Sequence, residues 1–118
     1  MRTLTAKQLR EQREQDDDLL LINVLDTDAY EKEHIPDSHN IPLSRDDFLH
    51  QVQDLAARMD RRIVVHCSSK DCKLSPTAAK KLEGVGFTNV ADFEGGMAEW
   101  KLAGFETESG APVVHASS

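Results

Sequence analysis

Short hydrophobic runs and longer amphipathic stretches alternate along this chain. The run at residues 19–24 is apolar apart from one asparagine, and the run at 62–66 reads Arg-Ile-Val-Val-His. Runs that are apolar throughout, rather than at every second position, are typical of strands buried on both faces of a parallel sheet. A further short strand is predicted at 89–92, and a brief one at 39–41 within a loop that contains two prolines.

The stretches between these runs carry helix start and stop signals. Helices are predicted over residues 6–14 and 26–33, from residue 44 onward, and over 76–84 and 97–103. Thr5 is expected to cap the first helix, and Ser75 followed by Pro76 has the form of an N-cap with proline at the first helical position. The alternation of strands and helices predicts an α/β layer fold around a mostly parallel sheet.

Two of the predicted helices carry apolar residues at helical spacing, which indicates a buried face. The residues expected to face the core are Phe48, Val52, Leu55 and Met59 in the third helix and Ala78, Leu82 and Val85 in the fourth. Gly86 is expected to end the fourth helix. Gly95 and Gly96 are expected to form a turn before the last helix.

Length and composition bound the class of protein. The chain has 118 residues, of which 39% are hydrophobic and 30% charged, as expected for one globular domain. We expect this domain to span residues 1–108 and a flexible tail to span 109–118. The apolar runs are far shorter than a membrane span, and the N-terminal residues do not resemble a signal peptide. We therefore expect a cytoplasmic protein without membrane association.

Charge is distributed unevenly along the chain. The net charge of −7 argues against a general nucleic-acid binder. Residues 60–81, however, hold six lysines and arginines against two aspartates, so this segment carries +4 and the remainder −11. A basic segment in an acidic protein suits a small anionic substrate. Lys70 and Lys73 are the best candidates for an electrostatic role.

Cys67 lies where a predicted strand is followed by a loop and a helix. Backbone N–H groups of such a loop, together with the positive end of the helix, stabilise an anion and lower the pKa of a thiol. Cys67 is therefore a candidate nucleophile. The loop residues expected to bind its substrate are Ser68, Ser69, Lys70, Asp71 and Lys73.

Cys72 lies in the same loop, and two interpretations of it remain open. It is either a chance thiol or a second sulfur that receives or resolves a group held on Cys67, since four intervening residues allow a disulfide if the backbone curls. A four-ligand zinc site is not expected, because His66 points to the opposite face from Cys67 if both belong to the strand. No other metal or cofactor is expected. His34 and His39 are expected to hold the proline-rich loop in place.

These features occur in an order that resembles a single-domain rhodanese of the rhodanese-like superfamily. The matching segments are Leu-Leu-Ile-Asn-Val at 20–24, Tyr-Glu-Lys-Glu-His-Ile-Pro at 30–36, Asn-Ile-Pro at 40–42, Ile-Val-Val-His-Cys at 63–67, Gly-Phe-Thr-Asn-Val at 86–90 and Gly-Gly-Met-Ala-Glu-Trp at 95–100. The resemblance implies a three-layer fold with a loop that wraps around the sulfur of Cys67. It also implies a sulfurtransferase in which Cys67 carries a persulfide between a donor such as thiosulfate and a thiophilic acceptor.

The loop departs from the family pattern. Lys70 and Cys72 stand where the common rhodanese loop has a glycine and an arginine, and Lys73 stands where phosphatases and arsenate reductases of this fold have an arginine. Two alternatives therefore stay open: a phosphatase or arsenate reductase that uses Cys67 and Lys73, and a catalytically weak binding or redox-sensing module. The expected partners of a sulfurtransferase are a small anionic sulfur donor and a thioredoxin-like or other thiol acceptor, with the oligomeric state undetermined.

Overall fold

The computed structural model describes residues 2–112 and contains an alternating series of strands and helices. The strands are β1 (Arg2–Thr3), β2 (Leu20–Asn23), β3 (His39–Asn40), β4 (Ile63–His66) and β5 (Val90–Phe93). The helices are α1 (Ala6–Gln15), α2 (Thr27–Lys32), α3 (Phe48–Ala56), α4 (Leu74–Gly84) and α5 (Gly96–Leu102). Of the tail expected at 109–118, residues 113–118 lie outside the described residues. No helix of residues 2–112 combines the length and the apolar character that crossing a bilayer requires.

The strands form one sheet in the order β1-β5-β4-β2-β3, and every pairing in it is parallel. The mostly parallel sheet expected from the sequence is thus confirmed. The central strand β4 pairs with β2 on one side and with β5 on the other, and its four residues are all buried. Because all strands run in the same direction, their carboxyl ends meet at one edge, and the residue after β4 lies in the middle of that edge.

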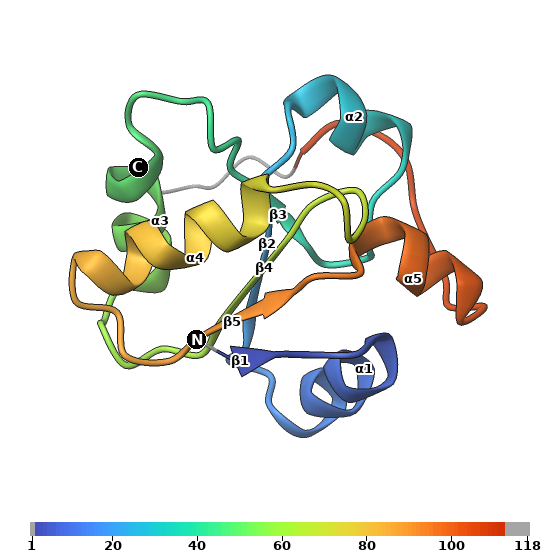
Figure 1. Ribbon diagram of the computed structural model, residues 1–118, viewed down its shortest axis with the longest axis horizontal. Coiled ribbons are helices and arrows are strands. Elements are labelled where there is room, and N and C mark those ends of the chain that lie inside the picture. The colour runs from blue at the N-terminus through green and yellow to red at the C-terminus, as the bar shows by residue number, and fades with distance from the viewer. Residues whose placement is uncertain (1, 113–118) are drawn as a thin grey trace.

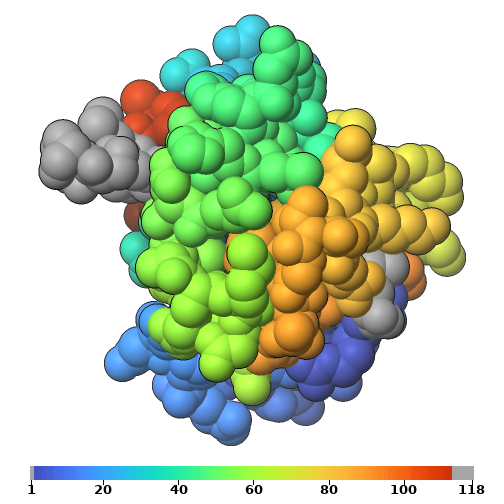
Figure 2. Space-filling view, turned by 90° about the vertical axis from the view of Figure 1, so that its left-hand side faces the viewer, coloured from blue at the N-terminus to red at the C-terminus, as the bar shows by residue number. Residues whose placement is uncertain are grey.

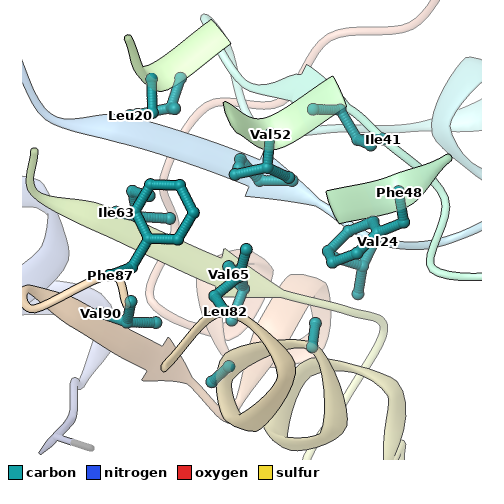
Figure 3. Packing of buried hydrophobic residues seen from close by; sticks show 14 of the residues in the cluster. Leu20, Val24, Ile41, Phe48, Val52, Ile63, Val65, Leu82, Phe87 and Val90 are labelled. Carbon is teal, nitrogen blue, oxygen red and sulfur yellow. The ribbon is translucent and has the colours of Figure 1, made fainter. Parts of the chain in front are cut away.

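Helices cover both faces of the sheet, so the fold has three layers (Figure 1). Helices α3 and α4 cover one face and lie side by side in the space-filling view (Figure 2). Their buried side chains, among them Val52 and Leu82, pack with Ile63 and Val65 of β4 in one cluster (Figure 3). Helices α1 and α5 cover the other face, where Leu9 and Trp100 belong to a second cluster with residues of β2, β4 and β5.

The first helix begins as the sequence predicts. The hydroxyl of Thr5 accepts a hydrogen bond from the Gln8 amide at 3.1 Å, and the Gln8 side chain accepts one from the Thr5 amide at 2.9 Å. This reciprocal pair satisfies two amide groups that the helix itself leaves free. The cap prediction is confirmed because a capping box depends only on residues close together in the chain.

Two predicted helix starts were wrong, and in neither helix does the expected serine form the cap. Helix α3 begins at Phe48 rather than at Ser44, whose hydroxyl donates instead to the Asp26 carboxylate at 3.0 Å. Helix α4 begins at Leu74 with Lys73 at the N-cap position, so Ser75 lies inside the first turn and is fully buried. A cap residue is recognised from local sequence, whereas these contacts depend on the tertiary fold.

Two residues expected to face the core were also placed wrongly. Met59 lies beyond the end of α3, and Val85 lies just beyond α4; both are exposed. Helix α3 ends early because Ala57 adopts a left-handed conformation with φ of 70°. Phe48, Val52, Ala78 and Leu82 are buried as predicted, and Leu55 packs partly buried against the same cluster.

Candidate functional site

Cys67 follows the last residue of β4 at the carboxyl edge of the sheet, and its side chain is fully buried. It packs on the side of the sheet covered by α3 and α4, with Val65 as a neighbour in that cluster. His66 points to the other face, where its ring lies 6.2 Å from that of Phe93. The opposite orientation of Cys67 and His66 is thus as expected, and within residues 2–112 no three His, Cys, Asp or Glu side chains gather to hold a metal ion.

The structure joins Cys67 and Cys72 by a disulfide bond, with their Cα atoms 6.4 Å apart. The intervening chain curls through a turn in which the Cys72 amide donates to the Ser69 carbonyl at 3.0 Å. This Cα separation is within the range of ordinary disulfides. The two sulfur atoms, which the sequence placed only in the same loop, therefore lie in direct contact.

The other residues predicted to bind substrate form the outer surface of this loop. Ser68, Lys70, Asp71 and Lys73 are exposed, and Ser69 is half-buried. Lys73 also precedes the first turn of α4, where its carbonyl accepts hydrogen bonds from both the amide and the hydroxyl of Thr77. The two lysines are therefore exposed in the loop that follows the buried Cys67, where they can attract an approaching anion.

The start of α5 binds the backbone of Cys67 and of the residue that follows it. The Met97 amide donates to the Cys67 carbonyl at 3.1 Å, and the Ala98 amide donates to the Ser68 carbonyl at 2.9 Å. Gly96 has φ of +56°, and a Cβ atom there would lie 2.2 Å from the Cys67 carbonyl oxygen. The sequence predicted a turn at this glycine, but its contact with the loop of Cys67 was missed.

Two buried polar side chains lie beneath the sulfur, and sequence reasoning missed their role. The Ser75 hydroxyl oxygen lies 3.5 Å from the Sγ of Cys67. Asp92, on β5, is also buried and interacts with Ser75. Burial raises the pKa of Asp92, while its hydrogen bond with Ser75 acts in the opposite direction. The only available signal was a charged residue within a predicted strand.

His66 and His34 take structural positions. Burial lowers the pKa of His66 to about 4, so its imidazole is neutral at neutral pH. Its Nε2 atom has no hydrogen-bond partner among the described residues. His34 stacks on Tyr30 with 3.8 Å between ring centroids, and its backbone pairs with Glu108. These contacts join His34 to α2 and to the segment at Glu108.

Comparisons with known proteins identify a family model that covers most of the chain. A family model described as a rhodanese-like domain matches residues 5–103. The thiosulfate sulfurtransferase GlpE of Pseudomonas syringae pv. syringae is 36% identical over 97 residues, which cover 81% of this chain and 80% of that protein. The HTH-type transcriptional regulator Rv0324 of Mycobacterium tuberculosis is 32% identical over 114 residues, which cover 95% of this chain and 47% of the regulator.

Solved structures agree with the sequence comparisons. A crystal structure of a thiosulfate sulfurtransferase from Pseudomonas aeruginosa superposes with a TM-score of 0.83 and 26% sequence identity. The match covers 93% of this chain and 20% of that chain. The present chain thus spans about half the length of the regulator and a fifth of the chain in the crystal structure.

Proposed function

We propose that this chain, which belongs to the rhodanese-like domain family, transfers sulfane sulfur from a small anionic donor such as thiosulfate to a thiol acceptor. The observation that carries the proposal is the position of Cys67, at the centre of the carboxyl edge of the sheet and in contact with a second cysteine. The similarity to a thiosulfate sulfurtransferase over most of both chains supports the same activity.

In the proposed loading step, the thiolate of reduced Cys67 attacks the outer sulfur of thiosulfate. The S–S bond of the donor breaks, sulfite leaves with the electron pair, and Cys67 becomes a persulfide. A free thiol with a pKa near ~8.5 is only slightly ionised at neutral pH, so the thiolate needs stabilisation. The first turn of α4, whose Ser75 contacts the sulfur, and the charges of Lys70 and Lys73 are suited to supply it.

Cys72 is proposed to resolve the persulfide. Its thiolate attacks the inner sulfur, which is the Sγ of Cys67, and the outer sulfur leaves as hydrosulfide. The product is the Cys67–Cys72 disulfide. A dithiol reductant of the thioredoxin type then takes up the two oxidising equivalents and restores both thiols. Without Cys72, the persulfide remains available for direct transfer to an external thiol or to cyanide.

Intact-mass measurement after thiosulfate treatment of the reduced protein tests this scheme. The Cys72→Ser variant is expected to gain the mass of one sulfur, whereas the parent is expected to lose two hydrogens and release sulfide. The Cys67→Ser variant, as a matched control, is expected to gain nothing and to lose thiosulfate-to-cyanide activity while staying folded. Unmodified Cys72→Ser protein after exposure to excess donor would refute the sulfurtransferase proposal.

A second candidate is a redox-sensing module, which the contact between Cys67 and Cys72 favours. A disulfide between them protects the thiol from irreversible oxidation, and a relative of this chain is a transcriptional regulator. Faster disulfide formation with peroxide than with thiosulfate would favour sensing. The phosphatase or arsenate reductase alternative is not proposed, because Lys73 lies at the surface and a lysine lacks the paired hydrogen bonds with which arginine holds an oxyanion.

A further inference from the structure

Cys67, Ser75 and Asp92 form a buried row that links the sulfur to a carboxyl group inside the protein. The Ser75 hydroxyl oxygen lies 3.5 Å from the Sγ of Cys67, and the Ser75 side chain also hydrogen-bonds with the carboxyl of Asp92. Ser75 has no exposed surface, and Asp92 has 2% of its surface exposed. The three residues come from the end of β4, the first turn of α4 and β5, so the tertiary fold alone brings them together.

The carboxyl of Asp92 binds a proton more readily than an exposed carboxyl does. Its Oδ1 atom has no hydrogen-bond partner among the described residues, and burying an ionised carboxylate without partners is costly. Burial raises the pKa of Asp92 most strongly, and the neighbouring carboxylate of Glu94 raises it further. The hydrogen bond with the Ser75 hydroxyl opposes both effects. Asp92 thus has the properties of a group that accepts a proton readily.

We propose that Ser75 and Asp92 take up the proton of Cys67 when its thiolate forms. Ser75 relays the proton, and Asp92, which acts on Cys67 only through Ser75, stores it. The inference deepens the proposed function, since it depends on Cys67 being the nucleophile. A hydroxyl is suited to the relay because it donates and accepts hydrogen bonds at the same time.

The proton transfer is balanced within the row formed by Cys67, Ser75 and Asp92. The Cys67 thiol gives its proton to the Ser75 oxygen while the Ser75 hydroxyl gives its own proton to the Asp92 carboxylate. The site changes from a thiol above a carboxylate to a thiolate above a carboxylic acid, and it holds one negative charge throughout. No charge has to be created inside the core, because the existing charge moves from oxygen to sulfur. A second negative charge appears only when the remaining proton leaves at higher pH.

Two groups that share a proton in this way titrate together, and this gives a measurable signature. The reduced Cys72→Ser variant has Cys67 as its sole thiol, because the chain has two cysteines. Its thiolate absorbance is recorded against pH, with the Cys67→Ser/Cys72→Ser double variant as the blank. The signal is expected to rise in two steps separated by a plateau. Within the plateau, a tenfold change in proton concentration should change the thiolate signal by less than about twofold.

Asp92→Asn in the same background removes the proton store and keeps the side-chain shape. Its thiolate signal is expected to rise in a single step and to change about tenfold per pH unit on the acid side. Glu94→Gln is the matched control, since it removes an exposed carboxylate two residues away, and it should keep both steps. A single step at the same pH in the Cys72→Ser protein with and without Asp92→Asn would overturn the proposal.

A second measurement does not depend on the folding of Asp92→Asn. The carbon-13 shift of the Asp92 carboxyl is expected to titrate in two steps in Cys72→Ser and in one step in the double variant that lacks Cys67. The same single step in both proteins would also overturn the proposal. No sulfur donor is present in these titrations. A failure of sulfur loading would therefore count against the proposed function only. The proton relay is tested separately, by the two titrations.

Discussion

Gly96→Ala is predicted to disturb the site through the backbone alone. The new Cβ atom would lie 2.2 Å from the carbonyl oxygen of Cys67, 2.9 Å from its carbonyl carbon and 3.0 Å from that of Ser68. All three are backbone atoms, so the contact cannot be relieved by rotating a side chain. The loop of Cys67 and the start of α5 must move apart, and the hydrogen bond from Met97 to the Cys67 carbonyl must lengthen or break.

The expected cost has two parts. An alanine at φ of +56° is strained by about 1–2 kcal/mol. The lost hydrogen bond between Met97 and Cys67 adds about 1 kcal/mol. The free energy of unfolding should therefore fall by about 2–3 kcal/mol, which is a large share of the stability of a domain of this size.

Two other glycines of the chain separate these contributions. Gly104 has φ of +79°, and a Cβ atom there would have no neighbouring atom within 4 Å, so Gly104→Ala should show the backbone strain alone, about 1–2 kcal/mol. Gly84, the last residue of α4, has open space and no positive φ, so Gly84→Ala should be neutral or stabilising by up to about 1 kcal/mol.

Urea denaturation of the three variants, compared in the same redox state, measures these differences. The expected order of stability is Gly84→Ala, then Gly104→Ala, then Gly96→Ala. Sulfur loading of Cys67 should be slowed only in Gly96→Ala, because this substitution alone displaces the backbone of the nucleophile. A Gly96→Ala protein as stable as Gly104→Ala would show that the close approach to Cys67 is not a constraint.

Further predictions concern the charges near the sulfur and the buried histidine. Lys70→Ala and Lys73→Ala should each raise the KM for thiosulfate about two- to fivefold at low salt, and less at high salt, because exposed charges are screened. His66 has its folded-state pKa lowered to about 4 from an unfolded value of about 6.5. The unfolded chain therefore binds more protons between these values, and the free energy of unfolding should fall on acidification from about pH 6.5 to about pH 4. His66→Gln should flatten this dependence in urea titrations.

Each of these predictions has a matched control. Lys80→Ala removes an exposed lysine of α4 outside the loop and should leave the KM for thiosulfate unchanged. If Lys80→Ala raises the KM for thiosulfate as much, Lys70 and Lys73 contribute only a general attraction of anions to the protein surface. His50→Gln removes an exposed histidine and is the comparison variant in the same urea titrations. If the free energy of unfolding of His66→Gln falls on acidification as much as that of the parent, the burial of His66 does not cause this fall.

The sequence by itself determined the order of the helices and of every strand except β1, which was not predicted, together with a mostly parallel sheet and the position of Cys67 at the end of a buried strand. These features follow from the apolar runs at 19–24 and 62–66 and from local signals such as the Thr5 capping box. Such signals involve residues close together in the chain, and their physical meaning hardly depends on the remainder of the fold.

The tertiary structure alone decided which polar residues surround the sulfur. Ser75 has the sequence pattern of a helix cap, yet its hydroxyl lies against Cys67, and Gly96 was expected only to form a turn. Asp92 reaches the site because β5 pairs with β4 in a register that sets it opposite Val65. These contacts join segments far apart in the chain, and their positions are fixed by strand register and helix packing, which no local pattern specifies.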